Sequence, residues 1–314
     1  MNQNRHAVGR AQAHFGWNHQ LTPVLHVAPG DIVTFDTIDA GGGQLNRNST
    51  VDDIGRFEFD RINPTFGPVY VDGAEPGDAL EVTVLNLEIA DWGWTANIPG
   101  FGLLAERFTD PALHIWKLDP VGLAPAEFKA GARVPLRPFP GIMGNALPEA
   151  GTHSVVNPRR FGGNMDTRDI GEGSRLLLPV GVPGALFSCG DGHAAQGDGE
   201  ICGTAIETPM RMTLKLDLVK RANLNFPRFT TSGPVSNHFD PGGYEVCMAM
   251  GGDLMTSAKN AVSDMVDWVA ATYQMADVEA YLLLSVCADL RINEIVDTPD
   301  WVVSCYLPKI VFQR

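Results

Sequence analysis

The sequence predicts an α+β protein that is mainly β, in which a β-sandwich-like body is followed by a C-terminal pair of helices. Before residue 250, glycines and prolines are interleaved with short β-branched runs, the pattern of strands joined by turns. After residue 250, apolar residues recur at helical spacing instead. We therefore expect residues 1–250 to form the body with the functional site, and residues 251–314 to form the helical pair and a final strand packed on it.

Three segments of the body are predicted to be strands. They span residues 31–37, 79–89 and 210–219 and are rich in β-branched and other apolar side chains. In the second segment, apolar residues from Leu80 to Leu87 alternate roughly with polar ones. This alternation is typical of a strand with one buried face.

A partial internal repeat supports the sandwich. Residues 28–33 and 75–80 both place a Pro-Gly-Asp turn immediately before an apolar strand. Two similar turns leading into strands indicate two sandwich-like halves.

The C-terminal segment is predicted to contain two helices and a strand. The first helix covers residues 258–273 behind a cap at Thr256 or Ser257, and its apolar stripe is typical of a packed core face. The second begins at a capping Asp277 and runs to about Leu290. Residues 301–306 then predict a strand.

Charge and composition exclude several classes of protein. With 37 acidic against 23 basic residues, the net charge of −14 repels nucleic-acid phosphates and anionic lipids. No apolar run is long enough to span a bilayer, and the polar N-terminus lacks a signal-peptide core. We therefore expect a soluble cytoplasmic protein that binds neither nucleic acid nor membranes.

The cysteines predict neither a disulfide framework nor a thiolate metal site. Their number is odd, and no Cys-x-x-Cys spacing occurs. We interpret all five as reduced core thiols. They are Cys189, Cys202, Cys247, Cys287 and Cys305.

Residues 188–200 are the strongest candidate for a chemical site. These thirteen residues hold three carboxylates, one imidazole and four glycines, a density that packing alone does not require. Asp191 and His193 are two positions apart and would project from the same face of an extended strand. Such a pair suits a metal ion or a hydrogen-bonded acid–base couple.

The motifs around this segment resemble those of the acetamidase/formamidase family. They begin with Gly-Gly-Asn-Met-Asp at residues 162–166 and continue with Gly-Ser-Arg at 173–175. Gly-Asp-x-His-x-x-Gln-Gly-Asp-Gly-Glu at 190–200 and Ile-Glu at 206–207 follow in the same order. The resemblance extends over nearly the whole chain and is weakest between residues 100 and 160.

The resemblance implies hydrolysis of a small uncharged carboxamide, or of a cyclic amide such as a γ-lactam, by a homo-oligomer. Aromatic residues in and beside the weakly matching region suit a substrate larger than formamide. Ordinary core packing is the alternative interpretation of these aromatic residues. They are Trp92, Trp94, Phe101 and Trp116.

Metal-assisted attack of water is the expected chemistry. A Gly-x-Ser-x-Gly motif is missing from the sequence, which disfavours a serine nucleophile. A divalent cation such as zinc needs only about three protein ligands besides water, and the sequence offers enough carboxylates and imidazoles to supply them. Asp191 and His193 are the first candidate ligands, and Asp166 is the next. His19 and Asp39 would join them from the N-terminal strands. Alternatively, Asp166 caps a turn and His19 is a core histidine.

Glu200 is the candidate general base, and Glu207 is its rival. Partial burial of Glu207 would raise its pKa and favour the role of acid. Asn164 is a candidate for binding the developing oxyanion, together with Gln196. The structural alternative is that either glutamate only accepts hydrogen bonds from buried backbone groups. Cys189 is a less favoured nucleophile within the same motif.

A different class of function uses the same residues. A β-sandwich protein that binds a small ligand or a metal without turnover would also need a cluster of carboxylates. Such a module needs ligands but no additional base, so the Glu200→Gln substitution separates the two hypotheses.

Overall fold

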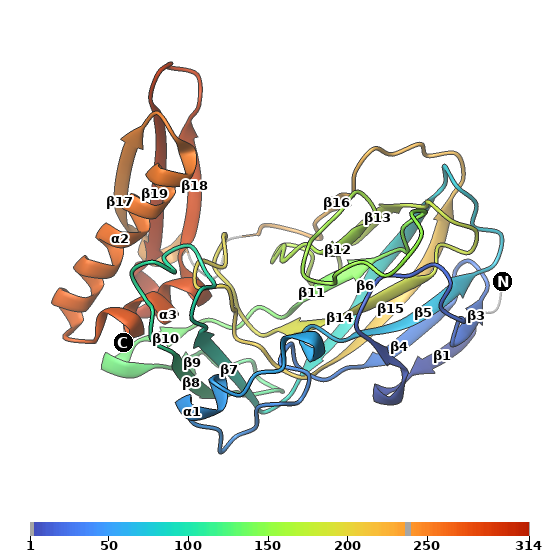
Figure 1. The fold of residues 1–314 in the computed structure, drawn as a ribbon, viewed down its shortest axis with the longest axis horizontal. Helices are drawn as coiled ribbons and strands as arrows, with labels where there is room; N and C mark the ends of the chain where they lie inside the picture. The colour runs from blue at the N-terminus through green and yellow to red at the C-terminus, as the bar shows by residue number, and fades with distance from the viewer. Residues whose placement is uncertain (1–2, 236–239, 314) are drawn as a thin grey trace.

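A computed structural model describes residues 3–235 and 240–313 of the chain. These residues are mainly β, as the sequence predicts. Two large sheets form a sandwich, and a C-terminal arm, residues 244–308, projects from one end of it (Figure 1).

The first sheet has six strands in the order β1-β4-β15-β6-β13-β16. Only β1 and β4 run parallel within it. Its strands are β1 (Arg5–Val8), β4 (Ile32–Asp36), β6 (Ala79–Ile89), β13 (Arg175–Pro179), β15 (Met210–Val219) and β16 (Arg228–Thr230). The strands predicted at 79–89 and 210–219 therefore coincide with β6 and β15, and the segment 31–37 contains β4.

The second sheet has the order β12-β11-β14-β5-β2, and β3 pairs in parallel with β5. Its central strand β14 lies between β11 and β5 and carries Asp191 and His193 at its end. The strands are β2 (Ala13–His14), β3 (Leu25–Val27), β5 (Thr65–Val71), β11 (Phe139–Gly144), β12 (Gly162–Asn164) and β14 (Phe187–His193).

The main core lies between the two sheets. The ring of Phe35 on β4 meets the ring of Phe187 on β14 edge to face, with centroids 5.9 Å apart. Both rings are fully buried, as are Leu80, Val82 and Val84 on β6. The apolar residues of the alternation expected in β6 therefore lie on the face that points into the core.

The predicted repeat of two Pro-Gly-Asp turns is present. The Asp31 carboxylate accepts a hydrogen bond from the backbone N–H of Ala28 at 3.1 Å, and Asp78 accepts one from Glu75 at 2.9 Å. Both carboxylates are buried. Each turn thus leads its chain into a strand of the first sheet, β4 or β6.

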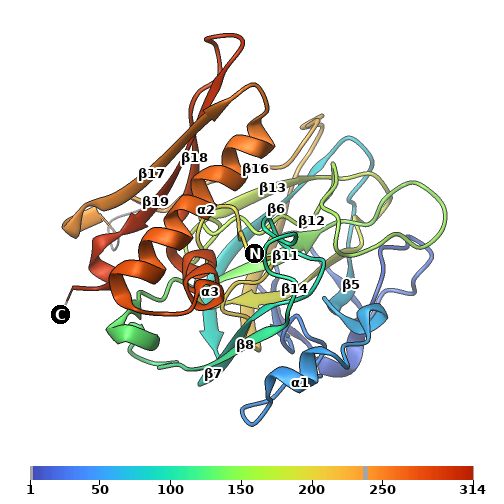
Figure 2. The ribbon, with the colours of Figure 1, turned by 60° about the vertical axis from the view of Figure 1, so that its left-hand side comes forward.

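The C-terminal arm is a three-stranded antiparallel sheet with a long helix packed on it (Figure 2). Helix α3 lies at the foot of the arm and packs against β7 and β8 of the body. The strand order is β17-β19-β18, so residues on both sides of the expected boundary at 250 belong to this sheet. The elements are β17 (Tyr244–Gly251), α2 (Leu254–Tyr273), α3 (Asp277–Cys287), β18 (Asp289–Glu294) and β19 (Trp301–Pro308).

The start of the first helix and the end of the second differ from those expected. The cap of α2 is Asp253, whose side chain accepts a hydrogen bond from the backbone N–H of Thr256 at 2.7 Å. Helix α3 ends at Cys287, three residues before the expected end at Leu290. The chain leaves the helix because Asp289 begins a strand that pairs with β19.

Among the described residues, no helix combines the length and apolar character needed to cross a membrane.

The remaining elements are short. The short helices are α1 (Val51–Ile54) and the 3-10 turns Arg10–Gln12, Phe59–Arg61, Lys129–Gly131, Asp240–Gly242 and Lys309–Val311. The remaining strands are β7 (Trp92–Asn97), β8 (Ala112–Lys117), β9 (Ala126–Glu127) and β10 (Arg133–Val134).

Candidate active site

Three neighbouring parts of the body bring the candidate residues together. Strand β14 carries Asp191 and His193, and the loop that follows it carries Gln196 and Glu200. Glu207 lies just before β15, where its backbone bridges to His193 on one side and to Trp94 on the other. The chain leaving β12, at the edge of the second sheet, contributes Asn164 and Asp166.

His193 is the centre of the cluster. Its Nδ1 lies 2.9 Å from Oε1 of Gln196, and its Nε2 lies 3.0 Å from Oδ1 of Asp191 and 3.2 Å from Oε2 of Glu207. The amide nitrogen of Gln196 donates to the backbone oxygen of Asp166 at 2.8 Å, so the amide oxygen faces the imidazole. Gln196 therefore accepts from Nδ1–H and leaves Nε2 facing the carboxylates.

Asp166 and Asp191 approach each other over Gly141 of β11. A Cβ atom at position 141 would lie 2.6 Å from Oδ2 of Asp191 and 2.7 Å from Oδ1 of Asp166. Asn164 donates to Oδ2 of Asp166 at 2.8 Å, whereas Oδ1 of Asp166 is buried and has no hydrogen-bond partner among the described residues. Only glycine at position 141 leaves room for this pair of carboxylates.

Three of the candidate residues have backbone conformations that non-glycine residues rarely adopt. The φ angles of Asp166, Asp191 and Glu200 are 45°, 57° and 43°, all in the left-handed region. Such conformations persist where the surrounding structure fixes them, and they are concentrated at functional sites.

Two features dominate the electrostatics of the cluster: its groups are buried, and its carboxylates outnumber the single imidazole. Burial raises the pKa of Asp166 to about 8, and Asp191 and Glu207 add to this effect. Burial likewise raises the pKa of Glu207 to about 7 and that of Glu200 well above its usual range. Burial alone would lower the pKa of His193, but Asp191 and Glu207 outweigh it and hold that pKa well above its usual value.

The residues fit a divalent cation. Asp166, Asp191 and His193 each offer a ligand atom within 4.8 Å of the others, and so do His193, Glu200 and Glu207. The buried Oδ1 of Asp166 lacks a hydrogen-bond partner among the described residues, and Oε2 of Glu207 faces Nε2 of His193 at 3.2 Å. Oxygen and imidazole donors of this kind suit zinc or a similar ion, whose charge would offset the excess of carboxylates.

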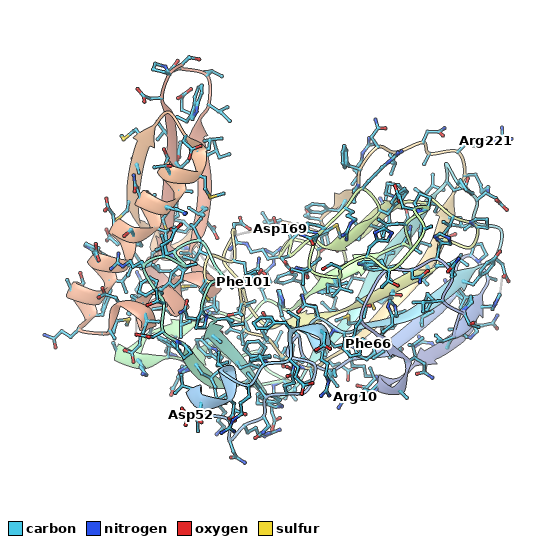
Figure 3. The ribbon with its side chains drawn as sticks, in the orientation of Figure 1. Arg10, Asp52, Phe66, Phe101, Asp169 and Arg221 are labelled. Atoms are coloured by element: carbon cyan, nitrogen blue, oxygen red, sulfur yellow. The ribbon has the colours of Figure 1, made fainter. Side chains whose placement is uncertain are left out.

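A cavity of about 620 Å³ opens above the cluster. Its walls are largely apolar. Phe101, one of the lining residues, lies between the arm and the sandwich (Figure 3). The apolar lining residues are Ala40, Phe57, Phe59, Ile62, Trp94, Ile98, Phe101, Val156, Pro158 and Met165. The polar ones are Asn63, Asn164, Asp166, Asp191, Gln196, Glu200, Thr204 and Glu207.

Comparison with known proteins identifies the family. The profile of the acetamidase/formamidase family matches residues 1–150 and 146–314. This chain belongs to the acetamidase/formamidase family. Amide hydrolysis, the activity expected from the sequence, is the chemistry of that family.

Individual members show how closely the chain matches the family. It is 25% identical to a formamidase of Methylophilus methylotrophus over 96% of this chain and 90% of the other. An acetamidase structure from Bacillus halodurans is 30% identical, covers 98% of both chains and superposes with a TM-score of 0.67. A γ-lactamase structure from Delftia acidovorans shares the fold, with a TM-score of 0.90 at 24% identity over 97% of this chain and 90% of that one.

The structure brings most of the sequence-predicted residues of this family member into one cluster, but it places two elsewhere. His19 donates from Nδ1 to the backbone oxygen of Leu147 at 3.0 Å and lies outside both groups of possible ligands. Asp39 is buried, and its Oδ1 accepts hydrogen bonds from Trp94 Nε1 and from Gly41, both at 2.9 Å. Its carboxylate therefore supports the cavity wall formed by Trp94.

Cys189 and the aromatic residues are also placed by the structure. Cys189 is fully buried in the main core, and burial raises its thiol pKa well above the usual value, which disfavours a nucleophilic thiolate. Trp94 and Phe101 line the cavity, as the larger-substrate interpretation requires. Trp116 instead stacks on Phe128 in the core, as the packing alternative expects.

Gly141 and Asn63 are among the residues of the site that were not predicted. Gly141 lies in an uncharged run with no local feature of a site, and its importance appears only when β11 is paired beside β14. Asn63 lines the cavity with its amide nitrogen 3.5 Å from Oδ1 of Asn164. It comes from the segment before β5, far from the glycine-rich motif in sequence.

Proposed function

We propose that this member of the family hydrolyses uncharged carboxamides with an apolar substituent, including cyclic amides, by metal-assisted attack of water. The observation that carries the proposal is the 620 Å³ cavity, whose floor carries the carboxylates of Asp191 and Glu200 below largely apolar walls, with His193 buried behind them. The floor supplies the groups that amide hydrolysis needs, and the walls suit a substituent larger than that of formamide or acetamide.

Asp166, Asp191 and His193 are the residues proposed to hold the cation, with zinc as the expected metal. When bound, the cation would polarise the amide carbonyl and lower the pKa of a water molecule. Gln196 fixes the orientation of His193 through Nδ1, and Asn164 fixes Asp166 through Oδ2.

Glu200 is proposed as the general base. It lines the cavity and faces the cluster without being fully buried, so it can accept a proton from the attacking water. The same proton passes to the leaving nitrogen as the C–N bond breaks, so that an amide and water yield a carboxylic acid and ammonia. The acid then gives its proton to ammonia, and the products are a carboxylate and ammonium. In a lactam the nitrogen stays attached, and the product is the ring-opened amino acid.

Glu207 and Asn164 complete the proposed roles. Glu207 Oε1 accepts a hydrogen bond from the backbone N–H of Ala205 at 2.8 Å, which holds the carboxyl group beside His193. Glu207 is therefore suited to act as a further metal ligand or as the acid that protonates the leaving nitrogen. The amide of Asn164 has a second N–H that can donate to the developing oxyanion.

The test is release of product from a panel of amides. Formamide, acetamide, a phenylalkyl carboxamide and a bicyclic γ-lactam are compared before chelation, after chelation and after restoring zinc. We expect the larger apolar amides to give the higher kcat/KM, with activity lost on chelation and recovered with metal. Turnover that survives complete removal of metal would contradict the metal-assisted mechanism, and absence of turnover with every amide would favour a binding protein.

The assembly proposed for this enzyme is a homo-oligomer, as expected from the sequence resemblance. Light scattering in solution should give a mass that is a multiple of that of one chain. A mass equal to one chain at all protein concentrations would contradict this part of the proposal.

A further inference from the structure

A buried ion pair lies beneath the candidate active site and has no role in the chemistry proposed above. The guanidinium group of Arg168 donates to both carboxylate oxygens of Asp289, with Nη2 2.8 Å from Oδ2. The two residues are only 4% and 1% exposed. A two-pronged geometry of this kind fixes the relative orientation of both side chains.

The pair connects the C-terminal arm to the loop that carries Gln196 and Glu200. Oδ1 of Asp289 accepts a hydrogen bond from the backbone N–H of Asp198 at 3.2 Å, and the backbone N–H of Leu290 donates to Asp198 at 2.9 Å. Nε of Arg168 lies 3.3 Å from the Asp198 carboxylate. The middle of the loop is therefore tied to the start of β18.

The loop fits closely at its next contact with the arm. The backbone N–H of Gly197 donates to the oxygen of Ser285 on α3 at 2.9 Å. A Cβ atom at position 197 would lie 1.8 Å from the backbone oxygen of Ala288, so no larger residue fits there without movement. The loop and the end of α3 thus have a single relative position.

Arg168 also belongs to the other segment of the site. It lies two residues after Asp166, and Thr167 between them donates to the backbone oxygen of Met165 at 3.0 Å. One ion pair therefore holds both the segment with Asp166 and the loop with Glu200. These two segments come from different parts of the chain and have to meet correctly at His193.

We propose that Arg168 and Asp289 are positioning residues that hold the loop 196–200 against the Asp166 segment. The pair acts through Gln196, which orients His193, and through Glu200. The importance of the pair for turnover rests on the proposed function, whereas its effect on loop order does not. A misplacement of about 1 Å at a reacting group can reduce rates by about 10²-fold.

The decisive variant is Asp289→Asn, which keeps the size of the side chain and one oxygen acceptor but removes the charge. Arg168→Lys is the second variant, because lysine keeps the charge but loses the planar fork. The matched control is Asp78→Asn. Asp78 is also a buried carboxylate bound by a cation, Lys220, and by backbone N–H groups, but it lies in a turn away from the cavity.

Two readouts are measured at a temperature at which all variants remain folded by circular dichroism. We expect Asp289→Asn and Arg168→Lys to lower kcat by about 10- to 100-fold with KM changed less than about threefold. Hydrogen exchange of residues 196–200 should accelerate in both variants and stay unchanged in Asp78→Asn. The control should retain kcat within about twofold of the unmodified enzyme.

The results that would overturn the proposal are distinct from failure of the proposed function. Equal kcat in Asp289→Asn and the unmodified enzyme, with loop exchange unchanged, would show that the pair does not position the site. If the unmodified protein hydrolyses no amide, loop exchange alone decides the positioning role. Failure of both variants to fold would assign the pair to global stability and overturn the proposal.

Discussion

Gly141 sets the distance between two of the carboxylates. We predict that Gly141→Ala lowers amide turnover at least about tenfold and destabilises the fold by about 1–3 kcal/mol, because the added methyl group would collide with Asp166 and Asp191. Steady-state kinetics and chemical unfolding measure the two effects. Gly55→Ala is the matched control, since a Cβ there would make an ordinary contact of 3.6 Å with the oxygen of Asp52. Equal losses in both variants would contradict the prediction.

Glu200 separates catalysis from binding at the scale of one side chain. We predict that Glu200→Gln reduces kcat by about 10²- to 10⁴-fold while the metal content stays the same, because an amide cannot accept the proton from water. Kinetics and elemental analysis of the purified protein measure the two quantities. Glu149→Gln, at an exposed position, serves as the control. If the metal is lost together with turnover, Glu200 is a ligand and not only a base.

The residues of the site were predictable to different degrees. The spacing alone predicts Asp191 and His193, because side chains two residues apart on a strand lie on the same face. In the structure both side chains belong to the cluster. Glu200 was indicated by the density of carboxylates in residues 188–200, and Glu207 by its expected partial burial. Their roles could not be assigned from the sequence, because no local periodicity distinguishes a ligand from a solvated carboxylate. Gly141 was not predictable, because its role depends on the pairing of β11 with β14.

At the scale of elements, the two Pro-Gly-Asp turns predict how stability depends on pH. Burial alone would raise the pKa of Asp31 and of Asp78, but hydrogen bonds from backbone N–H groups, His6 and Lys220 outweigh it and hold both pKa values below the usual 3.8. The folded protein thus binds these protons less readily than the unfolded chain. The stabilisation is present above pH 3.8 and is lost as pH falls below it.

Unfolding in denaturant at a series of pH values tests this dependence. The free energy of unfolding should fall steeply below about pH 4, and the fall should be shallower in the double variant Asp31→Asn, Asp78→Asn. Asp36→Asn, at a half-exposed carboxylate paired with Arg10, is the control and should leave the slope unchanged. An identical slope in the double variant would assign the acid sensitivity to other carboxylates.

The elements were predicted best where their pattern is local. β6 and β15 have the bounds expected, because alternation over ten or more residues fixes a strand. β17 and β18 were missed because their identity depends on pairing with β19, which lies later in the chain. The end of α3 was misplaced for the same reason, since Asp289 pairs with Arg168 and Tyr306 instead of continuing the helix.

At the scale of the whole molecule, the site joins parts that would otherwise repel one another. Asp166, Asp191, Glu200 and Glu207 come from three segments and converge on one imidazole. We predict that zinc raises the melting temperature of the metal-free protein, by an amount that corresponds to about 2.7 kcal/mol when free metal is 100 times its Kd. Calorimetry at several zinc concentrations measures the shift. The double variant Asp191→Asn, His193→Gln should show none, and an equal shift in that variant would place the metal elsewhere.

The connection between Asp289 and the loop at 196–200 also bears on how the enzyme is made. All the proposed catalytic groups have been synthesised once residue 207 has been added, yet Asp289, which ties down their loop, is added 82 residues later. A nascent chain therefore carries a complete set of reactive side chains before it can arrange them. Competence would be acquired only when the arm has emerged from the ribosome and folded, which links the onset of activity to the synthesis of the arm.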